Sequence, residues 1–181
     1  MTTIVDGTTG VSLVQDGVVV NADIVSVASS KVTGTFASSA ITGTTTNDNA
    51  AAGQVGEYIE SVVSAVNASA TATWGDMTSI TLTAGDWDVN LQSTCRMNSA
   101  TMTGQPTIGI GTASGNNSAG LTYGTTRSDG IIPTAGLDSS AVIAGVRKSL
   151  ASSTTIYAKL SASYSAGTPQ FYGRISARRV R

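Results

Sequence analysis

The stretch ITLTAGDWDVNLQSTCRM, residues 80–97, decides the fold class, because apolar and polar residues alternate along it on both sides of a short turn. Ile80 and Leu82 precede the turn at residues 84–86. After the turn, one face carries Trp87, Val89, Leu91, Ser93, Cys95 and Met97, and the other carries Asp88, Asn90, Gln92, Thr94 and Arg96. A period of two is typical of a half-buried β-strand. We expect a hairpin here, with Cys95 buried as a small apolar residue.

Alternation of the same kind predicts four more strands, at residues 107–112, 141–150, 154–164 and 170–180. Residues 54–66 are ambiguous, since their apolar residues fall at helical spacing while their β-branched side chains favour a strand. We expect a strand there and keep a helix as the alternative. Many short strands separated by turns predict an all-β fold, an antiparallel sandwich with little helix.

The composition argues against an enzyme. Only 12% of the 181 residues are charged, against about 25% in an ordinary soluble domain, and 27 Thr and 24 Ser take their place. The absence of His excludes a Ser-His-Asp triad, and a single Cys excludes an intrachain disulfide and a multi-cysteine metal site. Asp76, Asp86 and Asp88 lie near the two Trp residues, but the proximity of Asp86 to Asp88 is ordinary hairpin geometry. We therefore predict no catalytic residue, no cofactor and no metal.

The first 50 residues differ from the rest, and we predict two parts: an extended N-terminal segment, residues 1–50, and a β-sandwich head, residues 51–181. The apolar residues of the first part are too scattered to bury themselves within one chain, so they need neighbours. The candidate anchoring residues are Val11, Leu13, Val18, Val20 and Ile24. A flexible linker is the alternative. No apolar run approaches the roughly 18 residues of a membrane span, so we expect no membrane insertion.

Charge is polarised along the chain. All eleven acidic residues lie at or before Asp138, whereas seven of the ten basic residues follow it. The last strand concentrates four of them, Arg174, Arg178, Arg179 and Arg181. Such a basic terminus could bind nucleic acid, but the net charge of −1 and the placement in a strand argue against it. We expect these arginines to pair with acidic groups of neighbouring subunits.

Recognition is most plausible on the polar loops, because a rigid scaffold commonly presents its binding residues there. The candidates are Asn116, Asn117, Tyr123, Arg127 and Asp129, within residues 114–130. Aromatic, amide and charged side chains together suit a glycan. A plain solvent-exposed loop is the alternative.

Four phrases carry a resemblance to a known family. They are GTTGVSLVQDGVVVNADI at residues 7–24, NDNAAAGQVGEYI at 47–59, ITLTAGDWDV at 80–89 and FYGRISARRV at 171–180. They are similar to the attachment repeats, the joint and the inner strands of trimeric tail-fibre and head-fibre proteins of tailed bacteriophages. The shaft is short for a long tail fibre, which fits a small capsid or tail appendage better.

The resemblance implies a homotrimer with a jelly-roll head of tumour-necrosis-factor-like shape. It implies a virion protein, assembled in the host cytoplasm, whose N-terminal segment binds other capsid or tail proteins. The head would bind host surface polysaccharide. The alternatives are a capsid decoration or cement protein without receptor binding and, less favoured, a glycan-degrading spike enzyme.

Overall fold

A computed structural model describes residues 48–133 and 137–181 of the chain. The predicted anchoring residues Val11, Leu13, Val18, Val20 and Ile24 lie outside the described residues, so the N-terminal segment remains a prediction. At the start of the described part, the Asn49 side chain accepts a hydrogen bond from Tyr58 N (2.8 Å) and donates one to Tyr58 O (2.7 Å). Asn49 is thereby tied to the beginning of the first strand.

The described residues form ten strands and contain no helix. The strands are β1 (Tyr58–Asn67), β2 (Gly75–Leu82), β3 (Gly85–Arg96), β4 (Thr101–Met102), β5 (Thr107–Gly111), β6 (Arg127–Asp129), β7 (Asp138–Leu150), β8 (Thr154–Ser161), β9 (Tyr164–Ala166) and β10 (Gln170–Arg179). No helix in this part of the chain could therefore span a membrane.

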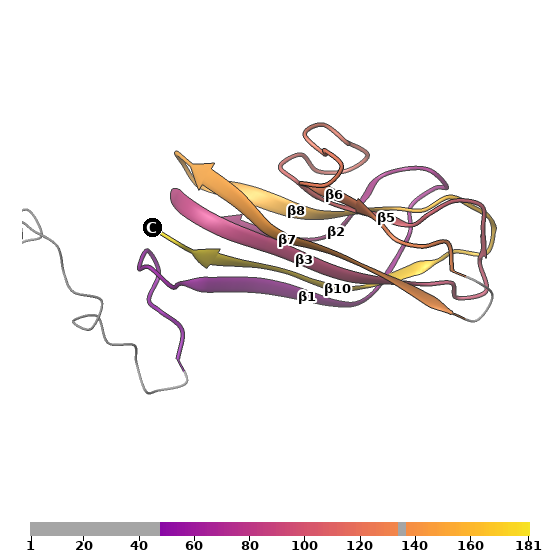
Figure 1. Ribbon diagram of the computed structural model, residues 1–181, viewed down its shortest axis with the longest axis horizontal. Helices are drawn as coiled ribbons and strands as arrows, with labels where there is room; N and C mark the ends of the chain where they lie inside the picture. Colours follow the sequence, from indigo (N-terminus) through magenta and orange to yellow (C-terminus); the bar gives the residue numbers. More distant parts are fainter. Residues whose placement is uncertain (1–47, 134–136) are drawn as a thin grey trace, which may run out of the picture. The chain divides into compact units, whose positions relative to one another are not determined.

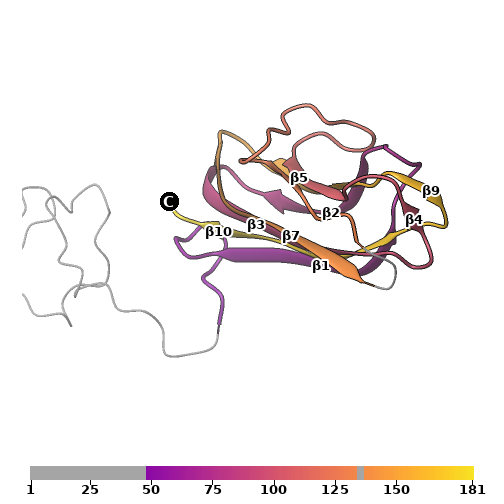
Figure 2. The ribbon, with the colours of Figure 1, turned by 45° about the vertical axis from the view of Figure 1, so that its right-hand side comes forward.

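Eight of these strands form two stacked four-stranded sheets (Figure 1). One sheet has the order β1-β10-β3-β7 and the other β2-β8-β5-β6, and all their strand pairs are antiparallel. Along the chain the eight strands switch sheets at every step except from β5 to β6. This is jelly-roll topology, so the predicted all-β jelly-roll head is confirmed. The short strands β4 and β9 pair at one end (Figure 2).

The core fills the space between the two sheets, and its residues lie on the faces that alternation predicted. Along β3, Trp87, Val89 and Leu91 are fully buried, and Cys95 is 2% exposed. The opposite sheet contributes Leu82, Ile108, Ile110, Ile156 and Leu160. Burying a side chain of this size contributes about 1.5–3 kcal/mol. The prediction for Cys95 is confirmed, and burial raises the pKa of its thiol to about 12.

The predicted hairpin at residues 80–97 is wrong. Strand β2 pairs with β8, and β3 pairs with β10 and β7, so the turn between β2 and β3 carries the chain from one sheet to the other. Gly85 makes this crossing with a φ of 143°. A Cβ at this position would lie 2.0 Å from Arg179 Nη1, so a side chain would displace the Arg179 guanidinium. Alternation showed which way each residue points, but strand pairing depends on distant segments.

The remaining strands agree with prediction apart from their ends. Residues 58–67 form strand β1, which settles the ambiguity of residues 54–66 in favour of β structure. The predicted strand at 154–164 is divided into β8 and β9. Arg127 and Asp129, which we placed on a loop, lie on the short edge strand β6. This strand has too few apolar residues to show in the sequence pattern.

Candidate functional site

The connection between β5 and β6, residues 112–126, folds over the outer face of the β2-β8-β5-β6 sheet. Lys159 of β8 points to this outer face, opposite the buried Ile156, Ala158 and Leu160, yet its exposure is 0% because the connection covers it. Leu121 packs on Gly109 of β5, where a Cβ would come within 3.0 Å of the leucine methyl groups. The connection is therefore packed onto the sheet.

A buried ion pair anchors this connection. Lys159 Nζ donates hydrogen bonds to Asp76 Oδ1 (2.5 Å), Ala113 O (3.1 Å) and Gly115 O (2.5 Å), which satisfies all three of its donors. Asp76 Oδ2 accepts hydrogen bonds from Ser114 Oγ (2.6 Å) and Gly115 N (2.8 Å). Burial acts to raise the pKa of Asp76, but these hydrogen bonds and the charge of Lys159 outweigh it and lower the pKa. We call this set of contacts the loop anchor.

Beyond the loop anchor, the Arg127 guanidinium lies over the rings of two aromatic side chains. Its guanidinium carbon is 3.8 Å from the centre of the Tyr123 ring and 5.3 Å from that of Trp74. Such cation–π contacts hold the guanidinium plane in place. Tyr123 is 60% exposed. Trp74 comes from the segment before β2, and its backbone N donates a hydrogen bond to Asn116 Oδ1 (3.1 Å).

The turn that carries Tyr123 is fixed by its own hydrogen bonds. Thr122 O accepts from Thr126 N (3.0 Å) and Arg127 N (2.9 Å), and Thr126 Oγ1 accepts from Thr122 N (2.8 Å). Thr126 O also accepts from Ile110 N (2.8 Å), which joins the turn to β5. The Tyr123 ring is therefore positioned against Arg127 without help from a ligand.

A groove of about 280 Å³ runs beside this stack, between the edge strands of the two sheets. Tyr123, Arg127 and Asp129 line its polar side. Residues 142–144 of β7 line the other side, where Val142 is 55% exposed. The site thus combines an aromatic ring, a guanidinium, a carboxylate and an apolar wall.

The structure brings together most of the predicted recognition residues. Tyr123, Arg127 and Asp129 lie at the groove, and Asn116 binds the backbone of Trp74. Asn117 does not reach the groove lining, and its Oδ1 accepts from Ala119 N (2.8 Å) within the loop. The sequence analysis missed Trp74 and Lys159 as parts of this site. The register of β2 against β8 places Asp76 opposite Lys159. Only this pairing brings Trp74 and Lys159 to the site.

Two of the four predicted intersubunit arginines lie on the outer face of the β1-β10-β3-β7 sheet. Arg174 Nη1 is 3.6 Å from Glu60 Oε2, and the Arg178 guanidinium lies 5.7 Å from the centre of the Tyr58 ring. Both partners belong to the neighbouring strand β1. Both arginines thus have partners within the chain, and their intersubunit pairing remains a prediction.

The other two predicted intersubunit arginines, Arg179 and Arg181, have acidic partners within the chain. Arg179 is 5% exposed and its Nε donates to Glu57 Oε2 at 3.0 Å. Arg181 Nε lies 3.0 Å from Asp86 Oδ2, which also binds Arg147 Nη2 at 2.8 Å. The four arginines therefore do not form one outward-facing cluster, because side chains alternate along the strand and Arg179 points inward.

Asp76 and Asp86, two of the three carboxylates near the Trp residues in sequence, are both paired with cations. The hydrogen bond from Arg147 is the main cause that lowers the pKa of Asp86, and it outweighs burial. Asp76 is held by the loop anchor. Among residues 48–133 and 137–181, no group of three or more Cys, Asp or Glu side chains is placed to hold a metal ion.

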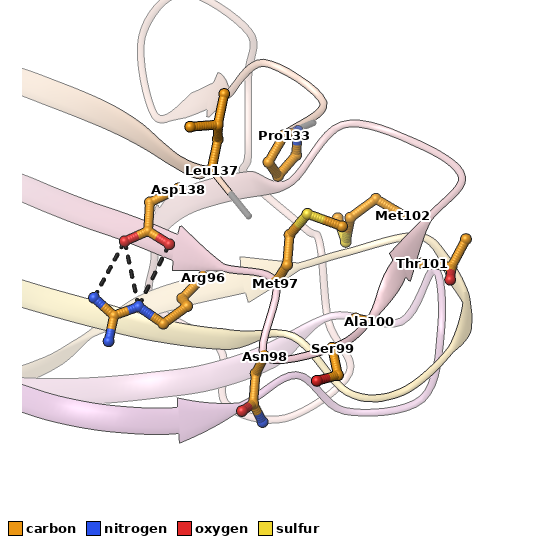
Figure 3. A pocket seen from close by; sticks show the side chains of 10 residues that line it. All are labelled: Arg96, Met97, Asn98, Ser99, Ala100, Thr101, Met102, Pro133, Leu137 and Asp138. Atoms are coloured by element: carbon orange, nitrogen blue, oxygen red, sulfur yellow. Dashed lines mark hydrogen bonds and ion pairs between the residues drawn. The ribbon is translucent and has the colours of Figure 1, made fainter. Parts of the chain in front are cut away.

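A larger pocket of about 930 Å³ lies at the C-terminal end of β3 (Figure 3). The side chains of Met97, Met102, Pro133 and Leu137 line it, and the Arg96–Asp138 ion pair (3.2 Å) borders it. Residues 134–136, which follow the lining residue Pro133 and precede the lining residue Leu137 in the sequence, are outside the described residues. We therefore assign no function to it.

No protein-family model matches the sequence, and no curated protein matches it significantly. Among solved structures, the VP2 subviral particle of infectious bursal disease virus aligns with a TM-score of 0.43 and 11% identity over 68% of this chain. The structure of the Gx strain of the same virus aligns with a TM-score of 0.43 and 14% identity over 68% of this chain. The alignments cover 33% and 32% of the viral chains, so this chain spans about a third of their length.

Proposed function

We propose that this protein is a structural and adhesive virion protein of a tailed bacteriophage, a short homotrimeric fibre or appendage whose head binds host surface glycan. The observation that carries the adhesive role is the stack of Tyr123 and Trp74 on Arg127 beside the groove. Exposed aromatic rings stack on sugar C–H faces, and fixed charged groups hydrogen-bond to hydroxyls, so a few convergent polar groups beside apolar surface suit a saccharide.

The virion role is supported by the sequence resemblance to phage fibre proteins, which implies a jelly-roll head. The described residues adopt that topology. A fold alone does not define a function, so the attachment of the N-terminal segment to capsid or tail proteins needs its own test. Deleting residues 1–46 should abolish attachment to particles and leave a β-rich circular dichroism spectrum. Decoration of particles by the shortened protein would place the anchor in the head instead.

The oligomeric state is a separate test. Light scattering of the purified full chain should give three times the chain mass of 18.2 kDa. A monomer would remove the argument that the N-terminal segment needs neighbouring chains to bury its apolar residues.

Glycan binding is tested by screening the full chain on an array of bacterial surface polysaccharides, with Tyr123→Ala as the matched variant. We expect binding by the unmodified chain and its loss in the variant, because Tyr123 is the exposed ring of the groove. Absence of any glycan binding would favour a capsid decoration protein. Cleavage of a polysaccharide would contradict the non-enzymatic proposal.

A further inference from the structure

We infer that the saccharide bound in the groove is acidic and that its carboxylate binds the terminal nitrogens of Arg127. This inference rests on the glycan-binding role proposed above and names the chemical class of its ligand. It is argued from the hydrogen-bonding state of Arg127, the aromatic rings that hold it, and the size and lining of the groove.

Arg127 has hydrogen-bond donors that the described residues leave unused. Its Nε is buried and makes no hydrogen bond, because Asp129 Oδ1, with which it forms an ion pair, lies 3.6 Å away. No described residue accepts a hydrogen bond from the two Nη atoms, which are not buried. By contrast, Arg96, Arg147 and Arg179 each hydrogen-bond a carboxylate. Among these arginines, Arg127 has its terminal fork open to a ligand.

The open fork suits a carboxylate better than a neutral hydroxyl. A guanidinium presents two parallel N–H donors that match the two oxygens of a carboxylate, and such charge-assisted pairs are about twice as strong as neutral hydrogen bonds. Tyr123 and Trp74 hold the guanidinium plane before the ligand arrives. Little side-chain entropy is then lost on binding.

The rest of the groove fits a sugar ring. Its volume of about 280 Å³ lies near the lower end of small-molecule pockets, which begin at about 300 Å³. One sugar unit therefore fits better than a long segment of chain. Asp129 supplies carboxylate oxygens that accept hydrogen bonds from sugar hydroxyls, and Val142 supplies an apolar wall for the C–H face.

The test compares each acid with its own methyl ester. Short oligosaccharides of galacturonate, glucuronate and N-acetylneuraminate, and the methyl ester of each, are titrated into the full chain by calorimetry at about 0.15 M salt, where long-range charge attraction is screened. At least one acid should bind at least ten-fold more tightly than its ester, because esterification removes the charge and leaves the sugar hydroxyls unchanged.

Two arginine variants locate the contact. Arg127→Lys keeps the positive charge but loses the planar fork, and it should weaken binding of that acid by at least ten-fold. Arg96→Gln is the matched control, because Arg96 also lies over an aromatic ring, that of Tyr172 at 4.9 Å, but away from the groove. It should leave binding unchanged. Circular dichroism confirms that each variant is folded.

The outcomes separate this inference from the proposed function. Equal binding of acids and esters, lost in Tyr123→Ala and retained in Arg127→Lys, would overturn the acidic ligand while the glycan-binding role survives. Binding of acids that Arg96→Gln weakens as much as Arg127→Lys would also overturn it, because the contact would be general charge attraction. If no oligosaccharide binds and the polysaccharide array is also negative, the proposed glycan-binding role fails and this inference fails with it.

Discussion

Two buried ion pairs hold opposite parts of this head, and they differ in what they stabilise. Glu57 and Arg179 join the segment before β1 to the end of β10, and both side chains are less than a tenth exposed. Lys159 and Asp76 join β8 to β2 and to the loop above them, and the Asp76 side chain is 25% exposed. The first pair links elements of the sandwich itself, whereas the second fixes a connection on its surface.

The comparison shows that the stability lost with one member of an ion pair depends on the hydrogen bonds and solvent access that the other member keeps. Without Arg179, Glu57 retains the hydrogen bond from Gly53 N (2.8 Å) in a buried place. Without Lys159, Asp76 retains the hydrogen bonds from Ser114 Oγ and Gly115 N and is partly exposed to water. We therefore expect loss of the first pair to destabilise the whole fold, and loss of the second to release mainly the loop.

The largest effect is expected for Arg179→Met. It leaves the Glu57 carboxylate buried without its cation, and breaking a buried pair in this way costs about 3–5 kcal/mol. The Arg179 contacts with Ala84 O and Thr83 Oγ1 are lost as well. Denaturant unfolding of the full chain measures the change. The double variant Glu57→Leu/Arg179→Met should recover part of the loss, and a loss of less than 1 kcal/mol in Arg179→Met would contradict the assigned role.

Acid should weaken both pairs, and the loss should begin at a higher pH for the Glu57 pair than for the Asp76 pair. The hydrogen bond from Gly53 and the contacts with Arg179 outweigh burial and lower the pKa of Glu57 from its ordinary 4.5, while the pKa of Asp76 is lowered from 3.8. A carboxyl group whose pKa is lowered in the folded state stabilises the fold at pH values above its ordinary pKa. This stabilisation is lost as the pH falls through the folded-state pKa. Tm should therefore begin to fall below pH 4.5. Glu57→Gln should remove this first part of the decline in Tm. An unchanged dependence of Tm on pH in that variant would contradict the role assigned to Glu57.

A smaller effect is expected for Lys159→Met. Removing the lysine leaves Asp76 and two loop carbonyls without their donor, which costs about 1–3 kcal/mol. Hydrogen exchange should accelerate at residues 113–121 and stay slow in β3 and β10. Uniform acceleration across both sheets would show that the two ion pairs do not differ in the way described. Asp76→Asn, the reciprocal change, leaves the fully buried Lys159 ammonium without its counter-charge and should release the loop at least as much.

The smallest effect is expected for Arg96→Ala. Arg96 and Asp138 form an exposed pair, with side chains 56% and 38% exposed, and such surface pairs contribute about 0.2–1 kcal/mol. The same unfolding measurement should place this variant closest to the unmodified chain. A loss as large as that of Arg179→Met would break the relation between burial and stabilisation on which the comparison rests.

Local alternation predicted the faces of the strands because each residue's direction depends only on its neighbours in sequence. The inward positions of Trp87, Val89 and Leu91 followed from that rule. The hairpin expected after Leu82 was wrong, because a short turn can either pair two strands or pass between sheets, and the choice is made by β8 and β10.

The candidate site was predictable in part. Tyr123 and Arg127 are close in sequence and meet through a local turn, so their pairing could be expected. Trp74 and Lys159 reach the site only through strand pairing over long sequence separations. The burial of Lys159 could not be predicted, because alternation places it on an outer face and gives no sign that a loop covers that face.

The loop anchor has a consequence for how this surface can change. Lys159 binds the backbone carbonyls of residues 113 and 115, and Asp76 binds the backbone N–H of residue 115, with Ser114 the only loop side chain involved. Backbone groups are common to all residue types, so the anchor does not depend on the identity of the residues beyond it. Residues 117–119, between Asn116, which binds Trp74, and Gly120, whose φ is 75°, can therefore be exchanged, by natural variation or by design, to present new binding surfaces on an unchanged sandwich.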